Sequence, residues 1–262
     1  MILKIGDDFK KKFWEYVSYE ECINLYIIAD VESYGFETEF LNVWMQVDDE
    51  NNACSIILRY YSTLIVYSYK NDFDVDELIQ HIESLDIDAI NGKKSVIDRL
   101  CTKFNNYKDK KECYFCSLTK LNDLSFDDSK DFKIEEAGVK DLEDVFKLLK
   151  KNEDFKLENY IQSKSRQIKT KSGRVYFIKK DNKVISTCGT GIENSFLAMI
   201  NGVATEENYK NKGLATYLVY TLSKKLLAEG KYPCLFYHNK DAGKIYYKIG
   251  YKAEDNWVML FK

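Results

Sequence analysis

Residues 201–216 have the sequence NGVATEENYKNKGLAT, and a helical pattern continues from there to Gly230. This stretch predicts a strand, a tight turn and a helix, with a glycine and two lysines where the helix begins. The first N–H groups of a helix lack partners and carry a partial positive charge, so they can bind a phosphate. Gly213 lets an anion approach the backbone closely, and Lys210 and Lys212 add positive charge beside it. The predicted ligand is a pyrophosphate.

The spacing of this turn fits neither a P-loop nor a dinucleotide fingerprint, because only one glycine lies in it. What remains is basic-x-x-Gly-x-Ala, formed by Lys210, Gly213 and Ala215. This pattern resembles the acyl-CoA pyrophosphate loop of the GNAT superfamily of N-acetyltransferases, usually Gln/Arg-x-x-Gly-x-Gly/Ala. Lysine at the first position keeps the charge but loses a forked donor. For the hexapeptide alone, an ordinary strand-to-helix turn is the alternative.

Length and composition exclude several classes of protein. The 262 residues can hold one large domain or two ordinary ones, and the net charge of −3 with no basic block disfavours nucleic acid as a partner. No apolar run is long enough to span a bilayer, and the N-terminus lacks the features of a signal peptide, so we expect a cytoplasmic protein with no membrane partner.

The seven cysteines are then expected to be reduced thiols. Cys113 and Cys116 form a CxxC pair in an apolar, strand-like run, where residues three apart point to opposite faces. No second pair accompanies them, and His81 and His238 are the only histidines, so we predict no metal site.

The hydrophobic pattern divides the chain into two halves separated by the polar residues 121–131, which we interpret as a linker. We predict domains at residues 1–125 and 126–262. In the first, helices are expected at 8–18, 19–33, 74–85 and 92–104, and strands at 41–47, 53–60, 63–69, 87–90 and 112–118. In the second, helices are expected at 141–150, about 157–168, 214–229 and 241–249, and strands at 132–136, 174–179, 183–190, 196–205, 233–237 and 257–261.

The two halves share one order of elements after their opening helices, which indicates an internal duplication. The predicted fold class is α/β (α+β), with two GNAT-like domains, each a mixed, mostly antiparallel sheet flanked by helices. In the first half, the corresponding strand-to-helix junction, residues 67–74, has no glycine and contains Asp72 and Asp74. Negative side chains at a helix start repel a phosphate, so we expect that only the second half has kept the anion site.

The resemblance to GNAT proteins continues through residues 239–251, where the family commonly has Asn, a small residue and Tyr-x-Lys-Leu/Ile-Gly-Phe. It implies acyl transfer from acetyl-CoA to an amine. Tyr246 matches the tyrosine that protonates the departing CoA thiolate, and a backbone N–H near Val203 and Ala204 would stabilise the oxyanion. A packed helix tyrosine and a helix-capping asparagine are the alternatives for Tyr246 and Asn239. The residues that the resemblance assigns to CoA binding are Val203, Ala204, Thr205, Lys210, Asn211, Lys212, Gly213, Leu214, Ala215, Thr216 and Asn239.

An amine must lose a proton before it attacks, and Glu193, Glu206 and Glu207 are the candidate bases, with no choice among them. We hypothesise an N-acetyltransferase that acts on a primary amine of a small molecule or peptide by direct transfer. A CoA-binding sensor or structural protein without activity is the alternative. Some tandem GNAT-like proteins use aminoacyl-tRNA. The net negative charge of this chain and its intact pyrophosphate loop disfavour that substrate here. The acceptor and the oligomeric state stay open.

Overall fold

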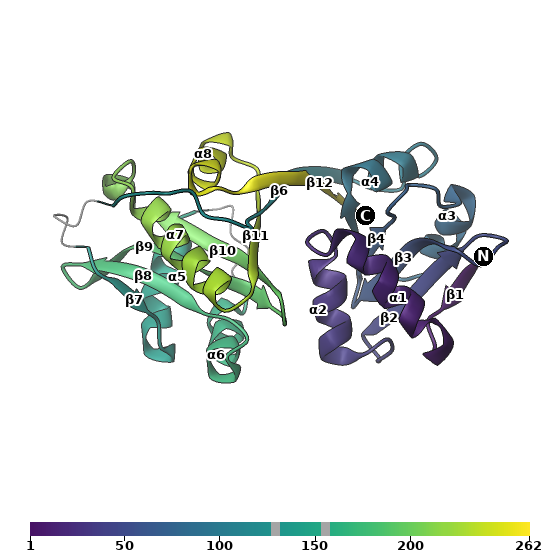
Figure 1. Cartoon of the computed structure of the whole chain (residues 1–262), viewed down its shortest axis with the longest axis horizontal. Coiled ribbons are helices and arrows are strands. Elements are labelled where there is room, and N and C mark those ends of the chain that lie inside the picture. Colours follow the sequence, from purple (N-terminus) through teal and green to yellow (C-terminus); the bar gives the residue numbers. More distant parts are fainter. Residues whose placement is uncertain (127–131, 153–157) are drawn as a thin grey trace. The chain divides into compact units, whose positions relative to one another are not determined.

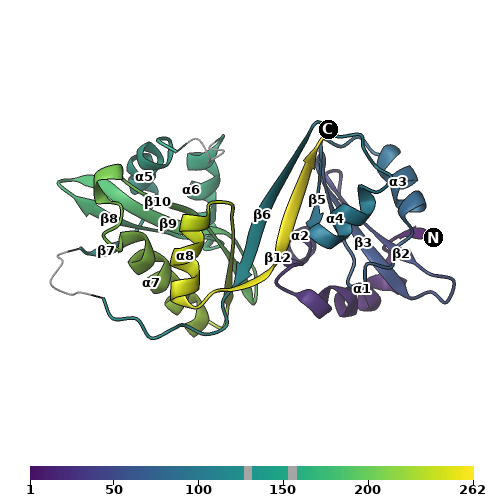
Figure 2. The ribbon, with the colours of Figure 1, turned by 90° about the horizontal axis from the view of Figure 1, so that it is seen from above.

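The computed structural model describes residues 1–126, 132–152 and 158–262. The chain divides into two compact units, which we call the N-terminal unit (Met1–Phe115 with Glu254–Lys262) and the C-terminal unit (Cys116–Ala253). Each unit is a mixed, mostly antiparallel sheet with helices on its faces (Figures 1 and 2), which confirms the predicted fold class. No helix within the described ranges has both the length and the hydropathy that crossing a bilayer requires.

The sheet of the N-terminal unit has the strand order β1-β2-β3-β4-β5-β12-β6, and among the pairs from β1 to β12 only β4 and β5 are parallel neighbours. The boundaries of the two units fall inside β6 and β12. The strands are β1 (Ile2–Lys4), β2 (Leu41–Val47), β3 (Ala53–Tyr60), β4 (Thr63–Tyr67), β5 (Ala89–Lys93), β6 (Asp109–Ser117) and β12 (Lys252–Phe261). The helices are α1 (Lys10–Val17), α2 (Leu25–Tyr34), α3 (Val75–Glu83) and α4 (Lys94–Leu100).

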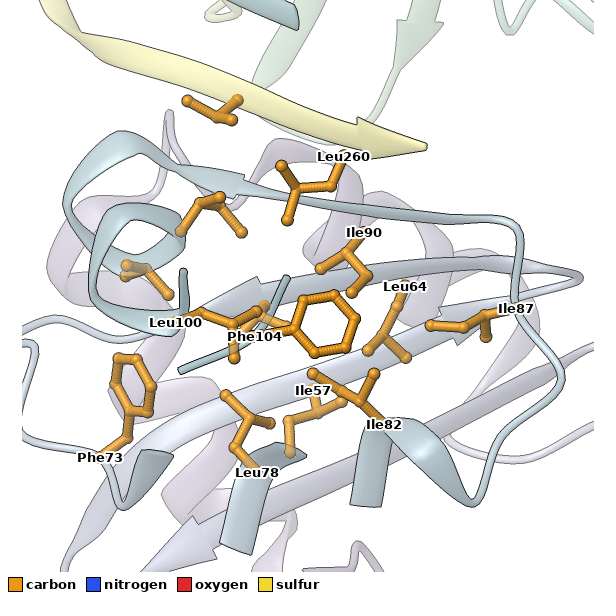
Figure 3. Close-up of a cluster of buried hydrophobic side chains, with 14 of the residues drawn as sticks. Ile57, Leu64, Phe73, Leu78, Ile82, Ile87, Ile90, Leu100, Phe104 and Leu260 are labelled. Carbon is orange, nitrogen blue, oxygen red and sulfur yellow. The ribbon is translucent and has the colours of Figure 1, made fainter. Parts of the chain in front are cut away.

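One core cluster of this unit lies where α3 and α4 cover one face of the sheet (Figure 3), and α1 lies on the opposite face (Figure 2). Side chains from β3, β4, β5 and both helices meet there, with Phe104 at the centre of the view. Val258 and Leu260 of β12 belong to the same cluster and are 0% and 1% exposed. The end of the chain therefore completes the sheet and core of the N-terminal unit, whereas the predicted boundary at residue 125 assigned it to the second domain.

The sheet of the C-terminal unit has the order β7-β8-β9-β10-β11, and again only one neighbouring pair, β10 and β11, is parallel. Helices α5 and α6 lie on one face, and α7 and α8 lie on the other (Figure 2). The strands that first appear here are β7 (Ile134–Glu136), β8 (Val175–Lys180), β9 (Lys183–Glu193), β10 (Leu197–Thr205) and β11 (Tyr232–Tyr237). The helices are α5 (Leu142–Leu149), α6 (Tyr160–Thr170), α7 (Leu214–Ala228) and α8 (Lys240–Ile249).

The duplication is more complete in the structure than in the sequence pattern. Each half of the chain runs strand, two helices, three strands, helix, strand, helix, strand. The prediction missed β1, which matches β7 in its place before the opening helices.

Several predicted boundaries were wrong. The helix expected from residue 92 begins at Lys94, since Gly92 belongs to β5, and the helix expected from residue 19 begins at Leu25 after the 3₁₀ turn Ser18–Glu20. Pro233 is the second residue of β11, not the first. Residues 127–131 of the expected linker and residue 157 of an expected helix lie outside the described residues. None of the seven cysteines, all of which lie within the described residues, forms a disulfide.

Candidate active site

Strand β10 departs from its neighbours at the position where the sequence places the acyl group. The register with β11 ends at the pair Ile200–Leu235, although β10 continues to Thr205. On the other side, β10 advances from Asn201 to Ala204 while β9 advances only from Gly189 to Thr187, so β10 carries one extra residue. Gly202 lies in this bulge with a φ of +61°. A bulge re-aims backbone groups, and β10 thus presents N–H and C=O groups beyond Ile200 that β11 does not use.

The loop after β10 leads into α7 through two left-handed residues. Asn211 and Gly213 have φ values of +60° and +83°, and a side chain on Gly213 would meet no atom within 4 Å. The hydrogen bond from the N–H of Tyr217 to the carbonyl of Gly213, at 2.9 Å, closes the first turn of α7. The N–H groups of Leu214, Ala215 and Thr216 precede that bond, so they face outward from the helix start as free donors. This geometry fits an anionic group such as a pyrophosphate.

The lysines of the loop are held by local partners. Lys210 Nζ lies 2.6 Å from Glu207, and both side chains are more than half exposed. Lys212 Nζ lies 4.7 Å from the centre of the Tyr209 ring. Exposed pairs of this kind are worth about 0–1 kcal/mol, so either lysine can turn towards a stronger anion at little cost. Thr205, at the end of β10, shares a 2.9 Å hydrogen bond with Ser186.

The two predicted residues on α8 differ in exposure. Asn239 is exposed and caps the helix, with its Oδ1 accepting a hydrogen bond from the N–H of Asp241 at 2.8 Å. The contacts of Asn239 are therefore those of a helix-capping asparagine, the alternative named for this residue. Tyr246 is buried, with 6% of its surface exposed, and α8 packs against α7 and β11. Its ring centroid lies 5.4 Å from that of Tyr237 and 5.9 Å from that of Tyr251.

The surroundings of Tyr246 keep its phenol protonated. Burial first, and then the nearby thiols of Cys188 and Cys116, raise the pKa of Tyr246 above the usual value of a phenol. A phenol with a raised pKa holds its proton throughout the neutral range and is available as a donor. A protonated phenol is what the protonation of a departing thiolate requires, and the raised pKa keeps the proton in place while making the phenol a weaker acid.

None of the three candidate bases is a free carboxylate. Glu193, whose side chain is 1% exposed, accepts hydrogen bonds from Arg174 at 2.7 and 2.8 Å, from Lys231 at 2.7 Å and from Thr190 at 2.8 Å. Burial alone would raise the pKa of Glu193, but these hydrogen bonds outweigh burial and lower it. Glu206 is paired with Lys151, and Glu207 is paired with Lys210. The described residues also contain no group of three His, Cys, Asp or Glu side chains that could hold a metal ion.

The equivalent junction of the N-terminal unit differs from the site on β10 and α7 in its strand pairing and at its helix head. Strand β4 pairs with β5 up to Val66 and Gly92 and ends one residue later, and its register with β3 has no bulge. A Cβ on Gly92 would lie 2.6 Å from the carbonyl oxygen of Val66, so glycine permits the two strands to stay close. At the head of α3, the Asp74 carboxylate already accepts from the N–H groups of Asp76 and Glu77 at 2.9 and 3.0 Å. A carboxylate of the protein itself thus occupies the donors that a phosphate would need.

Sequence reasoning missed three residues of this region. Gly202 forms the bulge, and Gly243 lies inside α8 against the ring of Tyr237. A glycine within a strand and a glycine within a helix were the available signals, since each is unfavourable there unless a bulge or a close contact requires it. Tyr237 carried no comparable signal in the sequence, because its contacts with Gly243 and Tyr246 depend on how α8 packs against β11.

The comparisons with known proteins agree with this geometry. The sequence model described as GNAT acetyltransferase matches residues 42–260. The chain therefore belongs to the GNAT acetyltransferase family. No curated protein matches the sequence.

Solved structures of low sequence identity share the fold. A GCN5-related N-acetyltransferase from Sphaerobacter thermophilus is 12% identical in sequence and has a TM-score of 0.66. The match covers 100% of this chain and 95% of the chain of that protein. A tandem GNAT protein from the clavulanic acid biosynthesis pathway, without AcCoA, is 12% identical with a TM-score of 0.57, covering 100% and 98%. At these identities the likeness concerns the fold alone.

Proposed function

We propose that this protein is an N-acetyltransferase that moves an acetyl group from acetyl-CoA to a primary amine of a small molecule or peptide in the cytoplasm. Residues 126–262, apart from the end of β12 that packs in the N-terminal unit, would form the catalytic domain, and residues 1–125 a degenerate copy. The observation that carries the proposal is the head of α7, where the left-handed Gly213 precedes N–H groups that have no partner inside the helix. Family membership supports acyl transfer as the reaction class.

Each part of the site would have its own task. The amides of α7 hold the pyrophosphate, and the loop lysines add charge once they leave Glu207 and Tyr209. The edge of β10 that β11 leaves unpaired beyond Ile200 hydrogen-bonds an extended pantetheine arm in the manner of an added strand. An N–H near Val203 or Ala204 stabilises the negative charge that develops on the thioester oxygen when the amine attacks.

Departure of the thiolate completes the transfer. The C–S bond breaks as the new amide forms, and the electron pair stays on sulfur. Tyr246 donates its phenolic proton to that sulfur, and exclusion of water around the ring favours the donation. Asn239, at the start of the same helix, would contact the cofactor with the part of its side chain that the helix cap does not use.

Two glycines of α7 provide a matched test. Gly213 and Gly230 stand at opposite ends of the helix with φ values of +83° and +78°, and a Cβ at either position would meet no atom within 4 Å. Substituting alanine at either position should lower stability by about 1 kcal/mol through backbone strain alone. Only Gly213→Ala places a methyl group where a phosphate would lie, so its Kd for CoA should rise about tenfold or more.

The measurement is isothermal titration with CoA, followed by thiol release from acetyl-CoA with a panel of amines. Equal affinities in the two alanine variants would contradict the assignment of the anion site. Binding of CoA without thiol release for any amine would point to the CoA-binding sensor instead of the enzyme.

A further inference from the structure

The ring of Tyr237 lies directly on α8 at a glycine. A Cβ on Gly243 would come within 2.7 Å of Cε2 of that ring and 3.0 Å of its Cζ and hydroxyl oxygen. Distances below 3.0 Å are not tolerated, and the obstacle here is a buried ring, since Tyr237 is 7% exposed. Glycine inside a helix costs about 0.5–1 kcal/mol relative to alanine. The close approach of this ring explains why α8 carries that cost.

The same ring forms one wall around the proposed proton donor. Its centroid lies 5.4 Å from that of Tyr246, with the planes inclined at 49°. Tyr251 stands on another side of Tyr246 at 5.9 Å and is fixed by a 2.8 Å hydrogen bond between its hydroxyl and that of Ser223. The ring of Tyr246 is therefore in contact with two other tyrosine rings, and the hydroxyl of each of these is hydrogen-bonded to a further side chain.

The anchor of Tyr237 is its hydroxyl. It donates a hydrogen bond of 2.8 Å to the hydroxyl of Tyr247, which is 45% exposed and lies on the next position of α8. Burial first, and then this hydrogen bond with Tyr247, raise the pKa of Tyr237. Its proton is thus directed to the surface tyrosine, while its ring faces Tyr246.

We propose that Tyr237, seated on Gly243, is a positioning residue that fixes the orientation of the Tyr246 ring for proton transfer to the CoA thiolate. The inference rests on the proposed function and adds two residues to it. Tyr237 acts through its ring, by contact with Tyr246, and not as a second acid. Because Gly243 has no side chain, the ring of Tyr237 can pack directly against the backbone of α8.

Three variants separate these roles in steady-state kinetics with acetyl-CoA. Gly243→Ala and Tyr237→Leu displace or remove the ring, so kcat should fall about 10- to 100-fold, with KM for acetyl-CoA changed less than about threefold. Tyr237→Phe keeps the ring and should retain kcat within about threefold. Tyr232→Leu, at the exposed start of the same strand, is the control and should match the wild type.

A double variant distinguishes positioning from loss of stability. In Gly243→Ala with Tyr237→Leu the clash is gone, so the midpoint of denaturation should equal that of Tyr237→Leu alone or exceed it while kcat stays low. A return of kcat together with stability would show that the ring matters only for folding. A loss in Tyr237→Phe as large as that in Tyr246→Phe would make Tyr237 a proton donor. Either result overturns the inference.

A readout that needs no activity keeps this inference separate from the proposed function. With 3-fluorotyrosine at position 246, the ¹⁹F resonance should shift and broaden in Gly243→Ala and Tyr237→Leu but not in Tyr237→Phe or Tyr232→Leu. An unchanged resonance in the first two would overturn positioning even in an active enzyme. Absence of thiol release in the wild type with the expected shifts would reject the enzyme and leave the contact between the rings standing.

Discussion

At the scale of single residues, the proton donor makes the sharpest prediction. Tyr246→Phe keeps the ring between Tyr237 and Tyr251 but removes the phenolic proton, so kcat should fall about 100-fold or more with Kd for CoA within about twofold. Tyr247→Phe removes an exposed hydroxyl that only accepts from Tyr237, and kcat should fall less than about threefold. Stopped-flow thiol release and CoA titration measure the two quantities. Equal losses in both variants would remove the role of acid from Tyr246.

A second residue-scale prediction concerns stability and pH. Burial raises the pKa of Asp30 on α2 from 3.8 to about 6. The folded state then binds more protons than the unfolded state between these values, so stability falls as the pH rises from about 4 to about 6 and stays low above that. At about 1.4 kcal/mol per pKa unit, the charge costs at most about 3 kcal/mol at neutral pH.

Asp30→Asn should therefore raise the free energy of unfolding by about 1–3 kcal/mol at pH 7.5 and by little at pH 4. Urea denaturation at both pH values gives the difference. Glu32→Gln, at an exposed position of the same helix, is the control and should change stability by less than about 0.5 kcal/mol at either pH. A gain for Asp30→Asn that is the same at both pH values would contradict the role of the buried charge.

At the scale of elements, the sequence shows which strands and helices exist better than it shows where they pair. The strand, loop and helix around Gly213 were predictable because glycine and lysine at a helix start have a local physical reason. The pairing of β12 with β5 could not be predicted. Periodicity indicates that residues 257–261 form a strand, but it does not indicate to which sheet the strand belongs. Gly92 was assigned to a helix for the same reason, because the carbonyl of Val66 that demands a glycine lies on another strand.

The C-terminal strand gives a prediction at this scale. Leu260 is 1% exposed within the core of the N-terminal unit, so Leu260→Ala should destabilise that unit by about 2–5 kcal/mol. Hydrogen exchange should become faster in β4 and β5, although these strands precede Leu260 by more than 160 residues in the sequence. Leu218→Ala, a fully buried leucine on α7, is the matched control and should speed exchange in β9 and β10 instead. Faster exchange confined to the C-terminal unit in Leu260→Ala would contradict the assignment of β12.

At the scale of the whole molecule, two copies of one fold differ where a ligand would bind. The two halves share one order of elements, and β10 and β4 differ in the strand pairing that a ligand site would use. Three features occur together in the C-terminal unit. They are a bulge, a strand that continues beyond its pairing with the parallel neighbour, and a helix start that no carboxylate caps. The sequence revealed only the last of these, because strand separation and bulges depend on the register between segments distant in sequence.

This contrast predicts one CoA per chain. Titration calorimetry of the full chain with CoA should give a stoichiometry near one, and Gly213→Ala should weaken all of the binding. Asp74→Gly, which frees the amides at the head of α3, should lower stability by a few tenths of a kcal/mol without adding a second site, because β4 and β5 stay paired to Val66 and Gly92. A stoichiometry near two, or full-affinity binding that survives Gly213→Ala, would show that the N-terminal unit binds CoA by contacts other than a helix head, and the distinction drawn between the two copies would fail.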